Sequence, residues 1–302
     1  MKNKSLFKKI TIIATIAIMT TFAVLMTACD KPKTIPKDIM FDDSNYTTTF
    51  FDDFNSNTLN RDVWRIETFE SKGNLRRGGY YSENNVLVED GKLKIRTNYQ
   101  TDGKNGEGWY TGWVDMAPQK SSASGYTGFA QKYGYFEVKC MAPPIQGAWS
   151  AAWMMPAEGV AFSPDDVLNT ASDGCEIDIM ESPGYASNGS YTQHVLHCDD
   201  YNNVKSQKSD KFQVDNMYTT FHTYAVEWTE NEFKFYIDGY LTWTTKYVFK
   251  NIELGVSHVL EYLILSVEVG NKDNSWAGLP DKNDKSKNYD YIIDSVRIMQ
   301  KK

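Results

Sequence analysis

Hydrophobic and polar residues alternate with a period of two over much of the chain after residue 46. In 222–229 (HTYAVEWT) and in 233–238 (FKFYID), apolar or aromatic side chains take every second position. Such alternation predicts half-buried β-strands, and Asp238-Gly239 before 241–245 predicts a hairpin turn. Further strands are expected at 85–89, 93–98, 134–141, 149–155, 175–181, 192–198, 260–268 and 290–299. Many short strands without an internal repeat predict an all-β chain folded as an antiparallel sandwich or barrel.

The N-terminus has the pattern of an export signal. Residues 1–9 are basic, residues 10–26 are apolar with scattered Thr, and Thr27-Ala28-Cys29 follows. Such a series is typical of a secretory signal peptide. A Cys directly after small residues resembles the lipobox of bacterial lipoproteins, here with Met26 in the place of the usual Leu. We therefore expect a signal peptide over 1–28 and lipidation of Cys29. An uncleaved membrane anchor is the alternative, although the apolar stretch is at the short end of the spanning range.

The next segment, 30–45, carries two Pro, three Lys and four Asp with little apolar periodicity. We interpret residues 29–45 as a lipidated Cys followed by a solvated tether, and residues 46–302 as one folded domain. Both interpretations of the N-terminus place this domain outside the cytoplasm. With a lipid on Cys29, it would sit on the extracellular face of a bacterial cell envelope.

Composition narrows the class of protein. Of 302 residues, 41% are hydrophobic and 24% are charged, which excludes a disordered chain, a collagen-like repeat and a polytopic membrane protein. The net charge is −7, and it becomes −11 without the four Lys of residues 1–28, so nucleic acid is not an expected partner. Cys140, Cys175 and Cys198 remain after Cys29, which leaves open one disulfide with a free thiol or three buried thiols.

The segment 174–183 (GCEIDIMESP) places three carboxylates in an otherwise apolar strand. In a regular strand, Glu176 and Asp178 share one face, and Glu181 would fall on the core face, where a carboxylate is costly. One extra residue near Ile179–Met180, a β-bulge, would return Glu181 to the face of the other two acids.

With such a bulge, the backbones of Glu176 and Glu181 are about 13 Å apart at roughly 3.3 Å per residue, and the side chains can close most of that gap. A retaining glycosidase uses two carboxyl groups about 5–5.5 Å apart as nucleophile and acid/base. Neighbouring carboxylates also push one member to keep its proton at neutral pH. A polar strand face or a Ca²⁺ site built from acids would give the same pattern.

The flanking sequence favours the first interpretation, because the chain resembles glycoside hydrolase family 16. Members of this family carry E-x-D-x-x-E or E-x-D-x-E on a strand of a β-jelly roll, and the longer form is laminarinase-like. Residues 133–156 resemble the family's Y-G-Y-F-E block and Trp-rich strand, 221–239 its F-H-x-Y-x-x-E-W block, and 289–300 its closing strand. The resemblance implies a concanavalin-like jelly roll with an open substrate cleft over 46–302.

The resemblance also implies roles. Glu176 would be the nucleophile, Asp178 its electrostatic assistant and Glu181 the general acid/base, with no cofactor needed for catalysis. Positions that match or lie near the family's substrate contacts are His197, Trp149, Trp153, Asn85, Arg76, Arg77 and Glu268. Further subsites are expected at aromatic residues in loop-like, Gly-rich stretches, namely Trp109, Trp113, Tyr80 and Trp276. For these residues the alternatives are core packing, a solvated turn or an ordinary polar strand position. One structural Ca²⁺ would use Asp53, the carbonyl of Gly91, and Asp294.

The expected activity is a retaining endo-β-glycanase, acting as a monomer on β-1,3 or mixed β-1,3/1,4 glucan. One departure concerns the substrate: 264–271 reads ILSVEVGN, so Glu268 stands where glucanases of the family have a small residue. This favours an alternative, an endo-acting hydrolase of β-galactan or mucin-type glycans, unless Glu268 is only a salt-bridged strand residue. A non-catalytic polysaccharide-binding lipoprotein is a third hypothesis, which retention of all three carboxylates disfavours.

Overall fold

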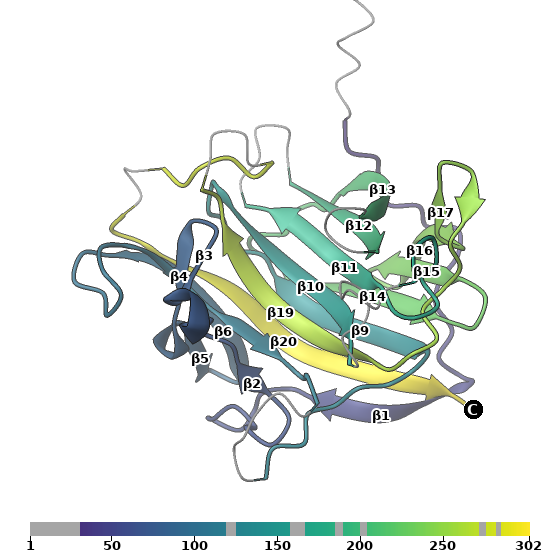
Figure 1. The fold of residues 1–302 in the computed structure, drawn as a ribbon, viewed down its shortest axis with the longest axis horizontal. Helices are drawn as coiled ribbons and strands as arrows, with labels where there is room; N and C mark the ends of the chain where they lie inside the picture. Colours follow the sequence, from purple (N-terminus) through teal and green to yellow (C-terminus); the bar gives the residue numbers. More distant parts are fainter. Residues whose placement is uncertain are drawn as a thin grey trace, which may run out of the picture. The chain divides into compact units, whose positions relative to one another are not determined.

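Two β-sheets stack on each other to form the folded unit, as expected for an antiparallel sandwich (Figure 1). The structure is a computed structural model, and it describes residues 31–118, 125–157, 167–184, 190–199, 204–271, 276–281 and 285–302. Within this part, Pro32–Lys302 is one compact unit. The predicted signal peptide over 1–28 and the predicted lipidation site Cys29 lie outside the described residues.

The first sheet has seven strands and carries the carboxylate segment at its centre. In spatial order its strands are β13 (Lys205–Gln213), β12 (Tyr191–Cys198), β11 (Glu176–Pro183), β10 (Ala148–Pro156), β19 (Glu261–Val269), β8 (Trp113–Asp115) and β2 (Arg65–Ile66). All of these neighbours pair antiparallel. The central strands β10 and β19 are buried at almost every residue, because one face lies in the core and the other is covered as well.

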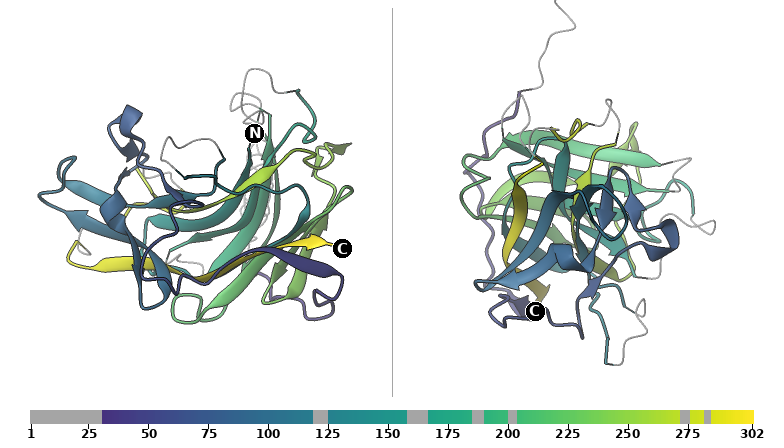
Figure 2. Two further views of the ribbon diagram at one scale, coloured as in Figure 1. Left: turned by 90° about the horizontal axis from the view of Figure 1, so that it is seen from below. Right: turned by 90° about the vertical axis from the view of Figure 1, so that its left-hand side faces the viewer.

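The second sheet has eleven strands and lies behind the first, and Figure 2 shows both as curved layers. Its path is β16 (Tyr240–Thr245), β15 (Phe233–Ile237), β14 (His222–Trp228), β9 (Gly134–Met141), β20 (Asn288–Lys301), β6 (Lys92–Gln100), β7 (Gly108–Thr111), β4 (Gly79–Tyr81) and β3 (Leu75–Arg76), with β1 (Tyr46–Asp52) on β20 and β5 (Val86–Glu89) on β6. β17 (Val248–Phe249) and β18 (Ile252–Glu253) form a small hairpin, and η1 (Glu70–Lys72) and η2 (Glu83–Asn85) are short 3-10 turns.

The core fills the space between the two sheets with aliphatic, aromatic and sulfur-containing side chains. Met180 of β11 lies 3.9 Å from the sulfur of Cys140 in β9 and 3.7 Å from the hydroxyl of Tyr291 in β20. Cys140, Cys175 and Cys198 are all free and buried, so the alternative of three buried thiols is the one observed. Burial raises the pKa of Cys140 and of Cys198 to about 12, which keeps both thiols protonated and inert.

The segment before residue 46 differs from the expected free tether. Lys33 exchanges backbone hydrogen bonds with Lys211 and Gln213 of the edge strand β13. Farther along, the carbonyl of Ile39 accepts from Leu241 of β16, and the Phe41 ring stacks on Tyr135 at 3.6 Å between centroids. Residues 33–41 therefore cover edge strands of both sheets, which protects those edges from pairing with other chains. Within the described residues, no helix has the length and apolar character needed to cross a membrane.

Candidate active site

The predicted bulge is present in β11 and sets the direction of the three carboxylates. Along β10, Ala152 pairs with Met180 and the next residue, Trp153, pairs with Asp178, so Ile179 is the extra residue. The pairing of β11 with β12 shifts over the same stretch, between Asp178 and Glu181. Ile179 and Met180 are both fully buried in the core. The bulge therefore returns Glu181 to the outer face of the sheet, beside Glu176 and Asp178.

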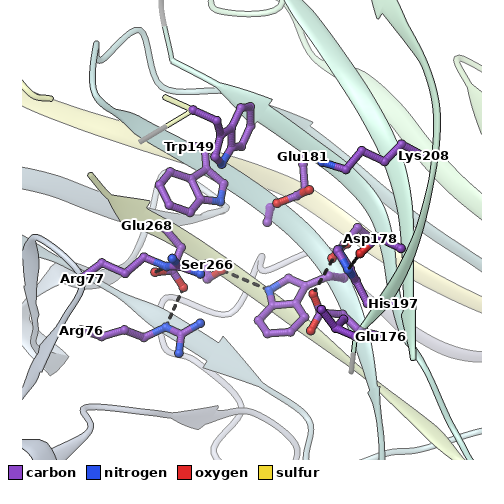
Figure 3. Close-up of a pocket in the computed structure, with 15 residues that line it drawn as sticks. Arg76, Arg77, Trp149, Glu176, Asp178, Glu181, His197, Lys208, Ser266 and Glu268 are labelled. Atoms are coloured by element: carbon purple, nitrogen blue, oxygen red, sulfur yellow. Dashed lines mark hydrogen bonds and ion pairs between the residues drawn. The ribbon is translucent and has the colours of Figure 1, made fainter. Parts of the chain in front are cut away.

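A cleft of about 320 Å³ runs across the outer face of the seven-stranded sheet (Figure 3). Five neighbouring strands, β13, β12, β11, β10 and β19, contribute side chains to it, and the β3–β4 hairpin closes one side. The lining residues are Arg76, Arg77, Trp149, Ala151, Trp153, Glu176, Asp178, Glu181, His197, Val204, Ser206, Lys208, Ser266, Glu268 and Trp276. Most of the substrate positions expected from the sequence are thus brought to one surface.

The three carboxyl groups share a partly desolvated environment. Burial and the neighbouring Asp178 raise the pKa of Glu176 to about 8 and that of Glu181 to about 8. Burial also raises the pKa of Asp178 to about 8, against the opposing effect of the Lys208 ammonium. Because each ionised carboxylate makes the next one harder to ionise, the protons leave in successive steps. The cluster can therefore present a carboxylate and a carboxylic acid at the same pH.

His197 lies opposite Glu176 in the β11–β12 pairing and contacts the carboxylate cluster. Its Nε2 is 3.4 Å from Asp178 Oδ2 and 3.8 Å from Glu176 Oε1, and its Nδ1 is 2.6 Å from the hydroxyl of Ser206. Asp178 is 3% exposed, and its Oδ2 has no hydrogen bond to a described residue. Ligand atoms of Glu176, Asp178 and His197 all lie within 4.8 Å of one another, so one metal ion could contact all three.

Three Trp residues predicted as sugar platforms line the cleft, but they differ in exposure. Trp153 is nearly buried, donates from Nε1 to Ser266 at 3.1 Å and packs edge-on against Trp113. It therefore serves both the core and the cleft floor. Trp149 is also nearly buried and lies 5.4 Å from the ring of Trp276, which is 49% exposed. Trp276 offers the accessible aromatic surface on which a sugar ring can stack.

Glu268 lines the cleft and is salt-bridged, as the alternative interpretation of this residue expected, and its part in choosing the substrate stays a prediction. Its Oε1 accepts from Nε of Arg76 at 2.8 Å, and its Oε2 accepts from Nε of Arg77 at 3.0 Å. Glu268 is 4% exposed, whereas the side chains of Arg76 and Arg77 are 27% and 49% exposed. The guanidinium of Arg77 also lies 5.1 Å above the ring of Trp149. These four residues fix one wall of the cleft.

Several predicted substrate contacts lie elsewhere. Asn85 is buried, and its amide donates to the Arg96 carbonyl and to Asn98, so it stabilises η2 against β6 instead of facing the cleft. Trp109 packs edge-on against Tyr99 outside the cleft lining. Tyr80, which stacks near Tyr110, and Trp113, which is buried beneath Arg76, are also outside that lining. Gly-rich surroundings suggested exposed loops for Tyr80, Trp109 and Trp113, but tertiary packing places these three residues in a sheet or in the core.

The residues predicted for Ca²⁺ do not fit the ion. Nζ of Lys92 lies 3.0 Å from the Asp294 carboxylate and 2.9 Å from the Gly91 carbonyl. Nζ of Lys139 lies 2.8 Å from the other oxygen of Asp294. The third predicted ligand, Asp53, accepts hydrogen bonds from the backbone and side chain of Asn55. A lysine ammonium thus takes the oxygens that a hard cation would need.

Sequence reasoning missed three polar residues of the cleft, namely Lys208, Ser206 and Ser266. Ser266 lies two positions before Glu268 on β19, so the period of two could have placed it on the same face. Ser206 and Lys208 belong to β13, whose sequence KSQKSDKFQ is polar on both faces. Such a sequence shows no alternation of apolar and polar residues, so the strand cannot be predicted from it. In the structure, β13 forms by pairing with β12.

Comparison with known proteins finds a β-glucanase and a laminarinase domain among the proteins that this chain resembles. A β-glucanase of Rhodothermus marinus is 29% identical over 179 residues, which are 55% of this chain and 57% of that protein. The chain thus spans less than two thirds of that relative's length. A laminarinase catalytic domain from Thermotoga maritima MSB8 matches with a TM-score of 0.65 at 22% identity, over 85% of this chain and 98% of that one.

A further solved structure has the same fold, and it comes from work on endo-acting O-glycanases that human gut bacteria express to initiate mucin breakdown. It matches with a TM-score of 0.65 at 21% identity, over 90% of this chain and 94% of that chain. The sequence profile named Glycosyl hydrolases family 16 matches residues 79–290, which include the carboxylate strand β11 and most of the cleft. The chain therefore belongs to glycosyl hydrolases family 16 and has the all-β jelly-roll fold of that family.

Proposed function

We propose that the protein is a retaining endo-β-glycanase that hydrolyses internal β-1,3 or mixed β-1,3/1,4 linkages of a polysaccharide. The observation that carries this proposal is the bulged strand β11, which turns Glu176, Asp178 and Glu181 into one cleft. Side chains of five adjacent strands line the cleft, so a long polymer can lie across the sheet. This arrangement supports hydrolysis at internal bonds of the polymer.

In the proposed reaction, the carboxylate of Glu176 attacks the anomeric carbon while Glu181 gives its proton to the glycosidic oxygen. The bond to the leaving glycan breaks, and an ester forms between the sugar and Glu176. Glu181, now a carboxylate, takes a proton from water, and the water oxygen attacks the same carbon. Glu176 leaves as a carboxylate, and two inversions restore the original configuration.

Asp178 and His197 support these steps from the side. Asp178 lies between the two Glu in the sequence and raises the pKa of both, which favours a shared proton within the cluster. The imidazole of His197 opposes that effect on Glu176 and on Glu181. The 2.6 Å contact between Nδ1 of His197 and the hydroxyl of Ser206 orients the imidazole, whose Nε2 faces Glu176 and Asp178.

A β-galactan or mucin-type glycan is the second candidate substrate, and Glu268 favours it. This carboxylate lies in the cleft wall where glucanases that the sequence resembles have a small residue, and it holds two Arg at the cleft. The relationship to a structure from work on mucin-degrading O-glycanases supports the same candidate. We expect the loops that border the cleft to decide whether the substrate is a glucan or a β-galactan or mucin-type glycan.

We further propose that the protein is exported, lipidated at Cys29 and held on the extracellular face of a bacterial envelope as a monomer. The basic, apolar and small-residue series of 1–29 supports this. If so, little free chain separates the lipid from the domain, because Lys33 already pairs with β13 and Ile39 with β16.

Two variants, Glu176→Gln and Glu181→Gln, test the assigned roles. The pair is compared on a polysaccharide substrate and on an oligosaccharide with a dinitrophenyl leaving group, which departs without a proton. Glu176→Gln should lose activity on both substrates, whereas Glu181→Gln should lose roughly 10²–10⁴-fold on the polysaccharide but far less in the first step on the activated glycoside. The reverse pattern would exchange the two roles, and full activity of both variants would refute the proposal.

A further inference from the structure

Three cationic side chains line the cleft beside the three carboxyl groups of β11 and Glu268. The whole chain has a net charge of −7, yet Arg76, Arg77 and Lys208 all line the same cleft. Glu268 is the one cleft acid outside the catalytic group, and it is shared between the two Arg. Beyond the catalytic carboxylates, the cleft therefore carries an excess of two positive charges.

Arg77 has a backbone conformation that a side chain of its type rarely adopts. Its φ is +54°, in the left-handed region, and it is followed directly by Gly78 and Gly79. A glycine at position 77 would relieve a strain of about 1 kcal/mol. Left-handed residues that are not glycine are concentrated at functional sites, where the side chain is needed despite the strain. Several described non-glycine residues have a positive φ, but Arg77 is the one among them whose side chain lines the cleft.

The tip of the β3–β4 hairpin is fixed against β19, so the position of Arg77 is well defined. Gly78 donates from its backbone to the Val269 carbonyl at 2.9 Å, and a side chain on Gly78 would meet the Gly270 carbonyl at 2.2 Å. Arg77 uses Nε for Glu268 and rests on the ring of Trp149. Its terminal nitrogens make no hydrogen bond to a described residue, and they remain available as a planar pair of donors.

Lys208 supplies a second cation across the cleft. It is exposed and forms no ion pair with any residue in the described parts of the chain. In Figure 3, Glu181 lies between Lys208 and Arg77, and both cations lower the pKa of that carboxyl. A sugar bound with its glycosidic oxygen at Glu181 would therefore have one of these cations on either side.

We propose that Arg77 and Lys208 bind acidic substituents of the glycan, so that the preferred substrate is an anionic polysaccharide bearing sulfate esters or carboxylates. This inference rests on the proposed endo-glycanase function and adds the charge class of its substrate. A planar guanidinium matches a sulfate or carboxylate in a bidentate manner, and an ammonium binds either group as a point charge. The shared chemistry is a singly charged oxyanion on the sugar ring next to the cleaved bond.

The test compares neutral and anionic forms of one backbone. The substrates are laminarin with its sulfated and C6-oxidised forms, and desulfated keratan with keratan sulfate. The ratio of kcat/KM for the anionic form to that for the neutral form should be about ten at low salt and should fall toward one in 0.5 M NaCl. Arg77→Gln and Lys208→Met should each lower this ratio by about threefold, so that the two cations together account for the preference.

Matched controls are Arg61→Gln and Lys37→Met, which remove exposed cations that do not line the cleft and should leave the ratio unchanged. A preference for the sulfated or for the oxidised form identifies the oxyanion. A wild-type ratio of one or less, or variants that behave as the controls do, would overturn the inference while the endo-glycanase function stands.

Two further outcomes are informative. Both cleft variants could shift the pH profile by the same amount on the neutral and on the anionic substrate and leave the ratio of kcat/KM unchanged. In that case Arg77 and Lys208 only lower the pKa of Glu181, and anion binding is refuted. If no substrate is cleaved, the proposed function fails instead. Calorimetric binding of the same glycans then decides the inference, because an anion preference that the cleft variants remove would support it and equal binding would refute it.

Discussion

Replacing Glu268 with Ala should destabilise the protein, because this carboxylate ties the β3–β4 hairpin to β19. Its two oxygens accept charge-assisted hydrogen bonds from Arg76 and Arg77 at 2.8 Å and 3.0 Å. Such bonds contribute about 1.5–3 kcal/mol each when fully desolvated. Both guanidinium groups are partly exposed, at 27% and 49%, and they can regain water in the variant, which reduces the loss.

We therefore expect a loss of about 2 kcal/mol in the free energy of unfolding, or a fall in Tm of about 4–8 °C for a chain of this size. Glu268→Gln keeps the shape but places an amide donor against one guanidinium, so it should lose a similar amount. The matched control is Glu89→Ala. Glu89 also has two cationic partners, Lys94 and Arg96, but its side chain is 48% exposed.

Chemical and thermal unfolding of the three variants, followed by circular dichroism, measure this difference. The control should lie within about 0.5 kcal/mol of the wild type, as is usual for exposed ion pairs. Equal stability of Glu268→Ala and Glu89→Ala would show that the buried carboxylate does not hold the hairpin. The argument that Glu268 fixes the position of Arg77 would then be refuted as well.

The remaining predictions concern pH and cations. As the pH rises, kcat/KM should begin to fall near pH 8, because Glu181 must hold its proton and its pKa is raised to about 8. A fall that begins near pH 5 in an activity assay would contradict this. Neither Ca²⁺ nor EDTA should change the Tm of the wild type, because the Lys92 ammonium already contacts Gly91 and Asp294. In Lys92→Met, by contrast, Ca²⁺ should raise Tm, and an effect of EDTA on the wild type would show that the site holds metal.

Much of the site follows from local rules that the sequence obeys. An acid at 181 could not stay in the core, so the alternation of β11 required an extra residue, and the bulge lies at Ile179 as predicted. Strands such as β14 and β15 were predicted because each has one apolar face and one polar face. His197 and Trp149, which the family resemblance assigned to the substrate cleft, do line the cleft, and their roles stay predictions.

The predictions that the structure does not bear out, and the contacts that the sequence did not indicate, have one physical cause: these residues contact segments that are distant in the sequence. Arg77 and Glu268 are 191 positions apart and meet only because the hairpin docks on the end of β19. Asn85 is drawn into the packing of η2 on β6, and Lys92 reaches Asp294 through the pairing of β6 with β20. None of these contacts leaves a periodic signal in the chain. Local patterns thus predict the strands and the catalytic face, whereas the walls of the cleft depend on tertiary packing.

The central claim is that the carboxylates of β11 cut a polysaccharide at internal bonds, and the most direct measurement is reducing-end release with product sizing over time. The wild type and Glu176→Gln are compared on laminarin, mixed-linkage β-glucan, agarose, an unsulfated β-galactan, keratan sulfate and mucin-type glycans. We predict a rapid fall in polymer length with mid-sized oligosaccharides appearing first, and no turnover by the variant, which should still be folded and bind the same glycan. Release of monosaccharides alone, or turnover that survives in the variant, would contradict the account.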